Sequence, residues 1–544
     1  MAKLGHKNQS VSVHQFAMAP RADIPRSSFR VQKMYKTTFD AGYLIPFYVD
    51  EILPGDSFSL SVTAFARLGT PLFPFMDNLW LDCFFFFVPN RLVWSNWQKF
   101  MGEQANPGDS ISFLVPTIQS EVGGFPLISV YDYFGLPTVG QVDPAEPVVV
   151  NSLPLRGYNK IYNAWFRDEN LQPSRPDLMA DGPDPQLADY ALVRRGKRHD
   201  YFTSCLPFLQ KGASVMMPLG TSAPVTITAQ PNTGSFTYPE FQSLGGVNDF
   251  GNLVQAVGGV VSVGAPVGTP EQITWLHPGL QGTADLSAAT AATINQLRQA
   301  FQIQKLLERD ARGGTRYTEI VHQHFGVISP DARLQRPEYL GGGSAAISVN
   351  PVAQTTPGAV VDGDTVGALG AAAVGLLRSG FHQSFTEHGY VIGLISARAD
   401  LTYQQGLRRM WSRSTRYDFY FPVFAALGEQ AVLNQEIFAD GSAADVGVFG
   451  YQERWAEYRY NPSEITANFR STAAASLDAW HLAQEFAVLP TLSSDFIQEF
   501  PPVDRVIAIN EAAPGQQFLL DAFFDIREAR PMPMYSVPGM IDHF

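Results

Sequence analysis

Alternating and continuous apolar runs predict β-strands near both ends of the chain. Residues 58–64 alternate between apolar and polar with a period of two, as in a strand with one buried face. Residues 80–88 form a continuous apolar run that stops at Pro89-Asn90, which is typical of a strand buried on both faces. Further strands are predicted at 390–397, 417–421, 506–509 and 517–526. The strands do not alternate regularly with helices, which favours an antiparallel sandwich over βαβ units.

Helical periodicity is clear in one segment. From Ser287 to Arg312 apolar residues recur at about 3.6-residue spacing, with Asp285 or Ser287 as the N-cap and Gly313-Gly314 as the end. Shorter helices are predicted over 92–101 and 478–486. The chain is therefore expected to be mainly β with a few helices.

Two long segments are interpreted as surface excursions. Residues 219–281 are rich in Gly, Pro, Thr, Ser and Val and hold only three charged side chains, and residues 341–380 are rich in Gly, Ala and Val. Long loops in a compact body are usually functional or disordered. The first segment contains enough aromatic residues to predict a small folded lobe: Phe236, Tyr238, Phe241, Phe250 and Trp275.

Composition argues against disorder and against a coiled coil. Only 16% of the 544 residues are charged, the net charge is −13, and Phe, Gly and Pro are abundant. A surface so poor in charge indicates large permanent interfaces. The only two cysteines, Cys83 and Cys205, exclude a disulfide framework, and Cys83 is expected to be a buried free thiol in a reducing compartment. The sequence shows neither a targeting segment nor an apolar run long enough to span a membrane.

Positive charge is concentrated at the start of the chain. The first 36 residues carry Asp23 as their only acid and seven bases, which are Lys3, Lys7, Arg21, Arg26, Arg30, Lys33 and Lys36. A basic arm of this kind either lies along a phosphate backbone or is a solvated, frayed terminus, and charge alone does not separate the two.

Three further basic clusters occur, at 194–198, 298–316 and 398–416. Arg beside aromatic rings, as in the third cluster, is compatible with single-stranded nucleic acid. For the second and third clusters, interface hydrogen bonds to carbonyls and carboxylates are the favoured interpretation.

Catalytic signatures are missing from the sequence. We find no nucleophile elbow, phosphate-binding loop or zinc-protease motif. His322 and His324 would share one face of a strand, but a third metal ligand is not apparent, so a surface or interface role is favoured. Two classes of protein remain: a self-assembling shell protein, and a β-protein that binds or cleaves glycans. The basic first 36 residues favour a shell that encloses nucleic acid.

Several long motifs follow one another along the chain. They include the run from Lys36 to Asp56, the run from Leu81 to Trp97 with Phe100-Met-Gly-Glu103, and the segments 195–204, 291–316, 333–343, 399–406 and 449–459. In these motifs the chain resembles the major capsid proteins of the Microviridae, the small icosahedral single-stranded-DNA phages, and most closely those of the gokushovirus branch.

This resemblance implies a viral jelly-roll β-sandwich with long loop insertions, in a T=1 shell of about sixty copies. It further implies a circular single-stranded DNA genome, assembly in the cytoplasm of a bacterial host, and contact with a host surface receptor and with a small basic internal DNA-binding protein. Neither an enzymatic activity nor a cofactor or metal is expected. An insertion at 219–284 is expected to form threefold protrusions that meet the host.

The expected organisation has five parts: a basic N-terminal arm in the shell interior (1–40), the first part of the jelly roll (41–218), the surface insertion (219–284), a helix with the rest of the jelly roll and a Gly/Ala-rich loop at 341–380 (285–529), and an extended C-terminal tail (530–544). The seven bases of the first 36 residues are expected to face DNA. The five aromatic residues of 219–284 are assigned to the threefold protrusion.

Overall fold

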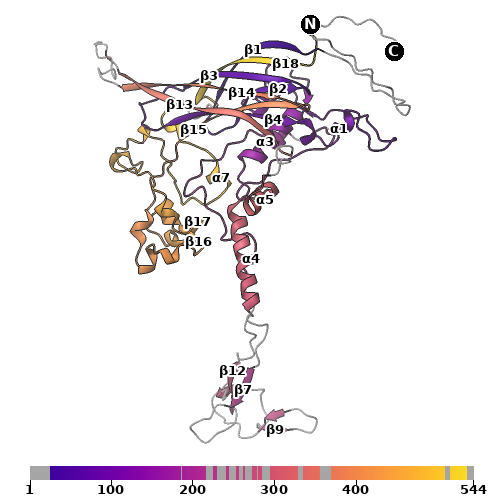
Figure 1. The fold of residues 1–544 in the computed structure, drawn as a ribbon. Coiled ribbons are helices and arrows are strands. Elements are labelled where there is room, and N and C mark those ends of the chain that lie inside the picture. The colour runs from indigo at the N-terminus through magenta and orange to yellow at the C-terminus, as the bar shows by residue number, and fades with distance from the viewer. Residues whose placement is uncertain are drawn as a thin grey trace. The chain divides into compact units, whose positions relative to one another are not determined.

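The computed structural model describes most of the chain (Figure 1). Its described residues are 25–185, 187–215, 294–328, 335–353, 355, 369–508 and 515–535, with six short strands between 225 and 284. The chain divides into two compact units. The first consists of Met1–Leu209 and Ala311–Phe544, and the second of Gln210–Asp310.

An eight-stranded antiparallel sheet is the centre of the first unit. Its strands, in spatial order, are β1 (Ser27–Phe39), β18 (Phe518–Arg530), β3 (Ser57–Leu68), β14 (Leu369–Ser384), β13 (Glu338–Ala353), β4 (Leu79–Pro89), β15 (Gly389–Ala399) and β2 (Ile45–Ile52). The strands predicted at 58–64, 80–88, 390–397 and 517–526 are confirmed as β3, β4, β15 and β18.

The pairing of these eight strands is nested. In chain order the first strand pairs with the eighth, the second with the seventh, the third with the sixth and the fourth with the fifth. A strip of four antiparallel pairs that folds over on itself is a jelly roll. Its two halves are β1-β18-β3-β14 and β13-β4-β15-β2, joined through the β13–β14 pair. The expected fold class, a mainly β jelly-roll sandwich, is confirmed.

Aromatic rings fill the space between the two halves. Phe47 of β2 lies 5.3 Å from Phe524 of β18, and Phe85 of β4 lies 5.4 Å from Phe381 of β14, measured between ring centroids. Cys83 is buried in this core, and its thiol forms no disulfide, as predicted. The Phe-rich composition therefore reflects a sandwich core built from large rings.

A second layer covers the outer face of the half that contains β4 and β15. Phe86 and Ile392 on that face pack with Trp94 and with Tyr158 of α3 (Leu153–Ile161) in one buried cluster. Gly157 lets α3 approach closely, because a Cβ there would lie 3.0 Å from Ile392. The remaining short elements of the first unit are α1 (Trp97–Phe100), β5 (Thr117–Gln119), α2 (Val130–Tyr133), β6 (Val149–Asn151), α5 (Tyr317–Phe325), β16 (Glu429–Leu433), α6 (Asn434–Ile437), β17 (Val448–Glu453) and α7 (Ser494–Ile497).

The helix predictions are only partly right. The long helix is present as α4 (Ile294–Arg312), and its predicted start at Ser287 lies outside the described residues. The helix predicted over 92–101 is reduced to α1 and a preceding 3₁₀ helix, Asn90–Leu92. Of the helix predicted over 478–486 only a 3₁₀ helix, Asp478–Trp480, is present, and the rest of that prediction is wrong. In both cases large side chains turn into the core at irregular spacing, so tertiary packing overrides a weak local preference.

Two predicted strands are absent. Residues 417–421 begin with a 3₁₀ helix, Arg416–Asp418, because the Asp418 carboxylate accepts hydrogen bonds from the backbone N–H groups of Ser414 and Thr415 and so stabilises a turn. The segment predicted at 506–509 follows a 3₁₀ helix, Val503–Arg505, and contributes only an isolated bridge from Ile507 to Pro71 within its described part.

The Gly/Ala-rich segment 341–380 is not a loop in its described parts, so this prediction is wrong. It forms most of β13 and β14, two long strands at the centre of the sheet. Its glycines allow close backbone approach: a Cβ at Gly342 would lie 2.3 Å from the Cys83 carbonyl oxygen, and one at Gly380 would lie 2.1 Å from the Leu60 carbonyl oxygen. Glycine in a strand often marks such an approach.

In the second unit, six short strands form three nested antiparallel pairs. They are β7 (Val225–Ala229) with β12 (Leu280–Ala284), β8 (Glu240–Ser243) with β11 (Ile273–His277), and β9 (Leu253–Gln255) with β10 (Val261–Val263). The chain therefore runs out and returns beside itself. Phe241 and Trp275 are opposite partners in the second pair, whereas Phe236, Tyr238 and Phe250 lie outside the described residues.

Candidate assembly and nucleic-acid-binding surfaces

The predicted basic arm is partly a strand. Residues 27–39 form β1, an edge strand paired with β18, so the expectation of an arm extending to residue 40 is corrected for this part. Lys3, Lys7 and Arg21 lie outside the described residues. The C-terminal tail predicted at 530–544 begins with the last residue of β18 and is described only to Tyr535.

Two bases of β1 already have carboxylate partners in the same chain. The guanidinium of Arg30 donates from Nε and Nη2 to the two carboxylate oxygens of Asp525, both at 2.9 Å, and Lys36 pairs with Asp521. The hydrogen bond from Arg30 lowers the pKa of Asp525. All four side chains are at least partly exposed, so the pairs are open to exchange with other anions.

The other two described bases have weaker contacts. Arg26 donates from Nη2 to Ser57 Oγ at 2.9 Å and to the Ala529 carbonyl at 3.3 Å. The Lys33 ammonium lies 5.5 Å from the ring centroid of Tyr48. Three of the four predicted DNA-facing residues that the structure describes thus lie on β1, and Arg26 directly precedes it; their contact with DNA stays a prediction.

The first basic cluster, 194–198, is structural. Arg194 lies between the rings of Tyr43 and Phe500, at 4.0 and 4.4 Å from their centroids. Arg195 donates from Nη1 to Asp82 Oδ2 at 2.6 Å. The same oxygen accepts a second 2.6 Å hydrogen bond, from Arg398 Nε on β15. Burial alone would raise the pKa of Asp82, but these hydrogen bonds and charges outweigh it, so the pKa lies below its ordinary value.

Lys197 of the same cluster is also buried. Its ammonium donates to Gln484 Oε1 at 2.8 Å, and desolvation lowers its pKa to about 8. Nearby Glu499 is buried too, and desolvation raises the pKa of its carboxyl to about 6. Both shifts come from burial, which disfavours the charged forms of the two groups.

A cavity of about 760 Å³ lies beside this cluster in the first unit. Five aromatic rings line it (Phe84, Phe86, Trp165, Phe166 and Tyr339), together with Arg195, Lys197 and Arg312. Several of the charges around it are already engaged in ion pairs: Arg195 with Asp82, Arg312 with Glu429, and Glu169 with Arg316. Asp168, Glu169, His199 and Cys205 also line it. Of these, Glu169 is paired with Arg316, and the Cys205 thiol donates to the Tyr201 carbonyl oxygen while burial raises the pKa of that thiol, which disfavours the reactive thiolate.

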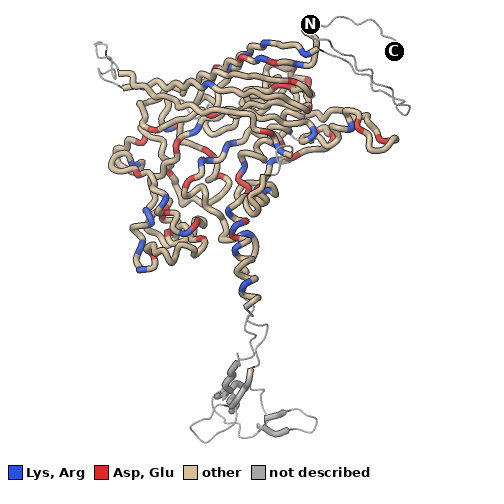
Figure 2. The backbone as a smooth tube through the Cα atoms, in the orientation of Figure 1, with Lys and Arg blue, Asp and Glu red and all other residues tan. Residues whose placement is uncertain are grey.

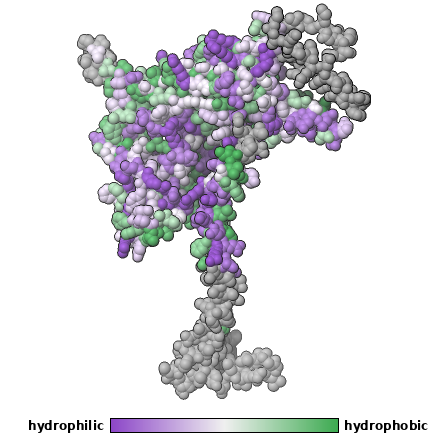
Figure 3. Space-filling model, viewed as in Figure 1, coloured by the Kyte–Doolittle hydropathy of each residue, from purple (hydrophilic) through white to green (hydrophobic). Residues whose placement is uncertain are grey.

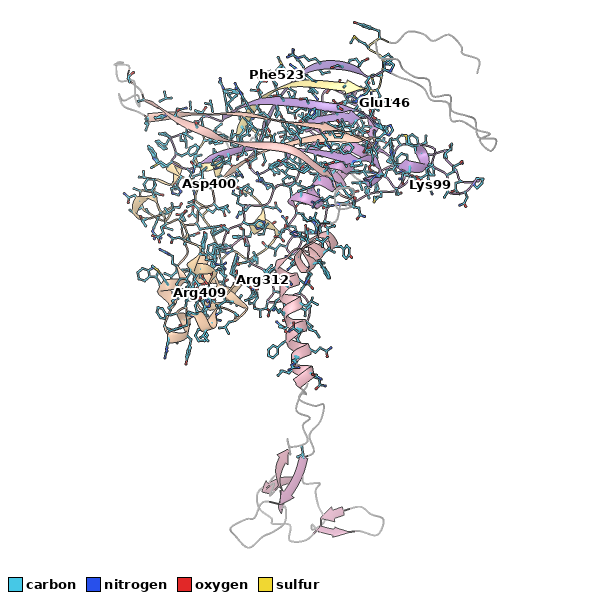
Figure 4. The ribbon with its side chains drawn as sticks, in the orientation of Figure 1. Lys99, Glu146, Arg312, Asp400, Arg409 and Phe523 are labelled. Atoms are coloured by element: carbon cyan, nitrogen blue, oxygen red, sulfur yellow. The ribbon has the colours of Figure 1, made fainter. Side chains whose placement is uncertain are left out.

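The other two clusters bond carboxylates, as favoured, but within one chain. In the third, Arg409 pairs with Glu436 at 3.0 Å, Arg413 with Glu457 at 3.1 Å, and Arg408 with Glu464 at 3.2 Å. Figure 4 shows Arg409 and Arg312 on segments that lie below the sheet. In this part of the chain Arg stabilises irregular loops by fixing their carboxylates.

Exposed apolar side chains gather beside the third cluster. Trp411, Tyr417 and Val423 are 69%, 68% and 81% exposed, and the same stretch also exposes Met410, Phe419, Tyr420 and Leu427. We call residues 410–427 the aromatic patch. This stretch directly precedes β16 in the sequence. Figure 3 shows hydrophobic residues among hydrophilic ones on the surface in the region of β16 and β17. Apolar surface of this extent on one subunit indicates a protein interface.

The two histidines of the predicted metal pair lie in a helix. His322 and His324 lie in helix α5, not on a strand, so they point to different sides and the shared-face prediction is wrong. Within the described residues no group of three or more His, Cys, Asp or Glu could hold a metal ion. Across the same residues, no helix has the length and apolar character needed to cross a membrane.

Comparison with known proteins identifies the family. The capsid protein (F protein) family matches residues 17–540. The chain is 49% identical to the capsid protein VP1 of Bdellovibrio phage phiMH2K, with both chains covered completely. It is 43% identical to VP1 of Chlamydia phage 1 (99% of this chain and 100% of the relative) and 36% identical to VP1 of Spiroplasma virus 4 (97% and 98%). These relatives are structural proteins of the virion, which decides between the two classes left open by the sequence. The chain therefore belongs to the Microviridae capsid protein (F protein) family.

Proposed function

We propose that about sixty copies of this chain assemble into a closed T=1 icosahedral shell around a circular single-stranded DNA genome. The aromatic patch is the observation that carries the assembly step, because its side chains need a partner surface to leave water. The capsid relatives support the same conclusion. No catalytic step is part of the proposal.

The proposal includes the partners of such a shell. Copies of the chain bind one another, the genome lies inside, and a small basic protein shares the neutralisation of phosphate. Assembly takes place in the cytoplasm of a bacterial host, and the insertion at 219–284 forms protrusions around the threefold axes that contact a host receptor. Nested strand pairs in that region support an outward excursion, because they return the chain to where it started.

Assembly is tested by the size of the purified material. We expect expressed chains to form particles roughly 250–300 Å in diameter, the size expected for about sixty 59.8 kDa subunits. Electron microscopy and size-exclusion chromatography measure this. If both the expressed chain and protein taken from phage remain monomeric at every salt concentration, the proposal is contradicted.

The seven bases of the first 36 residues provide a second test. The variant replaces all seven by Gln: Lys3, Lys7, Arg21, Arg26, Arg30, Lys33 and Lys36. It is expected to lower the DNA packaged per particle while the fold stays intact, because the lost cations no longer neutralise phosphate. Each lost single-strand contact should also lower the slope of log affinity against log salt by about 0.7. The matched control is Asp521→Asn with Asp525→Asn, which frees Lys36 and Arg30 and is expected to steepen the salt dependence. Unchanged packaging in the all-Gln variant would exclude a role for these bases.

A further inference from the structure

The two outer faces of the sandwich differ in what covers them. The outer face of β13-β4-β15-β2 packs against α3 and neighbouring segments. No described helix lies over the outer face of β1-β18-β3-β14 in Figure 1, and its outward side chains are exposed or half-buried. We call the outward residues of these four strands the open face.

Strand register places the open-face residues in rows across the four strands. The five rows that hold its charged and aromatic side chains are Arg30–Arg527–Ser59–His382, Gln32–Asp525–Ser61–Gly380, Met34–Phe523–Thr63–Arg378, Lys36–Asp521–Phe65–Leu376 and Thr38–Leu519–Arg67–Val374. Directly opposite residues of antiparallel strands point to the same side, so each row is a set of neighbours.

The open face is positively charged on a chain whose net charge is −13. It carries five Lys or Arg residues and only two Asp residues. The two Asp residues pair with Arg30 and Lys36, and Figure 2 shows the mixed charges on β1 and β18. Arg67, Arg378 and Arg527 have no ion pair with any described residue. Their register separates successive guanidiniums by four residues along the strands, which is roughly 14 Å.

One row sets like charges against each other. Arg30 lies directly opposite Arg527, and His382 is in the same row. Like charges in opposite positions destabilise a sheet. Arg30 relieves part of this repulsion by turning diagonally to Asp525, whereas Arg527 forms no ion pair with any described residue and acts on Asp525 only through its charge. A bound anion at this end of the face would remove the remaining repulsion.

Between the bases lie aromatic rings and small hydroxyls. Phe523 and Phe65 are half-buried on adjacent strands of the open face, and Ser59, Ser61 and Thr63 leave the surface around them low. Figure 4 places Phe523 at the upper surface of the sheet. Rings that stack on bases, flanked by cations that follow the backbone, are how single-stranded nucleic acid binds without sequence preference. Arg67 lies 5.3 Å from the Phe65 ring centroid, so a cation is already held beside one ring.

A second copy of the chain fits this face less well. Seven of the twenty positions in these five rows are Lys, Arg or Asp, whereas the core of a permanent protein interface is depleted in charged residues. The aromatic patch has the opposite character, with apolar side chains exposed at most positions. The two surfaces therefore suit different partners.

We propose that the open face binds single-stranded DNA, with Arg67, Arg378 and Arg527 on phosphates and Phe523 and Phe65 stacking on bases. This inference rests on the proposed function, since it makes the open face the surface that meets the enclosed genome. Binding is independent of base sequence, because the face offers stacking and charge and no set of paired donors and acceptors matched to one base.

The test compares two triple variants in assembled particles. Arg67→Gln/Arg378→Gln/Arg527→Gln is expected to form particles of normal size with severalfold less nuclease-protected DNA. The control, Lys99→Gln/Arg459→Gln/Arg470→Gln, removes three exposed bases that lie outside both the open face and the aromatic patch, and is expected to package normally. With full-length subunits and an oligo-dT probe, the face variant should lower the slope of log affinity against log salt by about 2, since each contact contributes about 0.7.

Ultraviolet crosslinking of unmodified particles gives an independent readout. Crosslinked nucleotides are expected on peptides from β18 and β3, which contain Phe523 and Phe65. Equal protected DNA in the two triple variants, or crosslinks confined to other peptides, would overturn the inference. A face variant that folds but forms no particles would identify the open face as a subunit contact instead. Unmodified chains that form no DNA-containing particle would contradict the proposed function itself.

Discussion

Asp82→Ala is expected to lower the free energy of unfolding by about 3–5 kcal/mol, because it leaves two buried guanidiniums without their carboxylate. Asp82 lies on β4 in the centre of the sheet, and Arg195 and Arg398 both donate to its Oδ2 at 2.6 Å. All three side chains are largely buried. Urea titration of the dissociated subunit measures the loss, and particle yield should fall with it.

Matched variants separate charge from packing. Asp82→Asn keeps the shape and one acceptor oxygen but removes the charge, so we expect a loss smaller than that of Asp82→Ala. Lys36→Ala breaks an exposed pair and serves as the control, with little expected effect. If Asp82→Ala and Lys36→Ala prove equally mild, the buried trio does not hold the 194–198 segment to the sheet.

The same carboxyl predicts how stability responds to acid. The pKa of Asp82 is lower in the folded chain than its ordinary value of about 3.9, so the unfolded chain binds the proton more readily. Its contribution to stability is therefore fully present above that value and is lost as the pH falls through the folded pKa. Asp82→Asn should flatten the acid side of the stability profile relative to the unmodified chain.

Local pattern predicted the long strands whose apolar residues alternate or run continuously. It failed at the short apolar segments 417–421 and 506–509, which are not strands, and where glycine replaces the apolar residues. β3 and β4 have such signals, and both were predicted. β13 and β14 carry small residues because neighbouring backbones approach them closely, and the same residues are typical of loops. The nested pairing of eight strands links residues hundreds of positions apart, so the jelly roll was predicted from the family resemblance and not from periodicity.

Charge patterns predicted where bases lie but not what they contact. The basic residues of β1 were identified from sequence, yet their partners Asp521 and Asp525 are almost five hundred residues away. Arg67, Arg378 and Arg527 were missed as a set, because each is a single base in a different strand. In the sequence, each of these residues occupies an outward-facing position of its strand. Only the register of the paired strands shows that the three lie on one surface.

Removal of the insertion is expected to abolish host attachment while leaving the shell intact. Ala229 and Leu280 are opposite partners in the β7–β12 pair, so replacing residues 230–279 by Asn-Gly would close this pair as a two-residue hairpin. The flanking chain then keeps its spacing, and the eight-stranded sheet lies entirely outside the deleted segment. We expect the free energy of unfolding to be nearly unchanged.

Attachment is measured as the loss of free particles from a suspension of the bacterium that propagates the phage. We expect the shortened chain to form particles whose adsorption rate is at least about tenfold lower, because loops on a rigid scaffold carry recognition. The control replaces Phe241 and Trp275, opposite partners in the β8–β11 pair, with a Thr pair that keeps the strands and removes both rings. Weak adsorption in the control would assign recognition to the aromatic lobe itself. Normal adsorption of the shortened particle would place recognition elsewhere on the capsid, and failure to form any particle would make the insertion a threefold clamp between subunits.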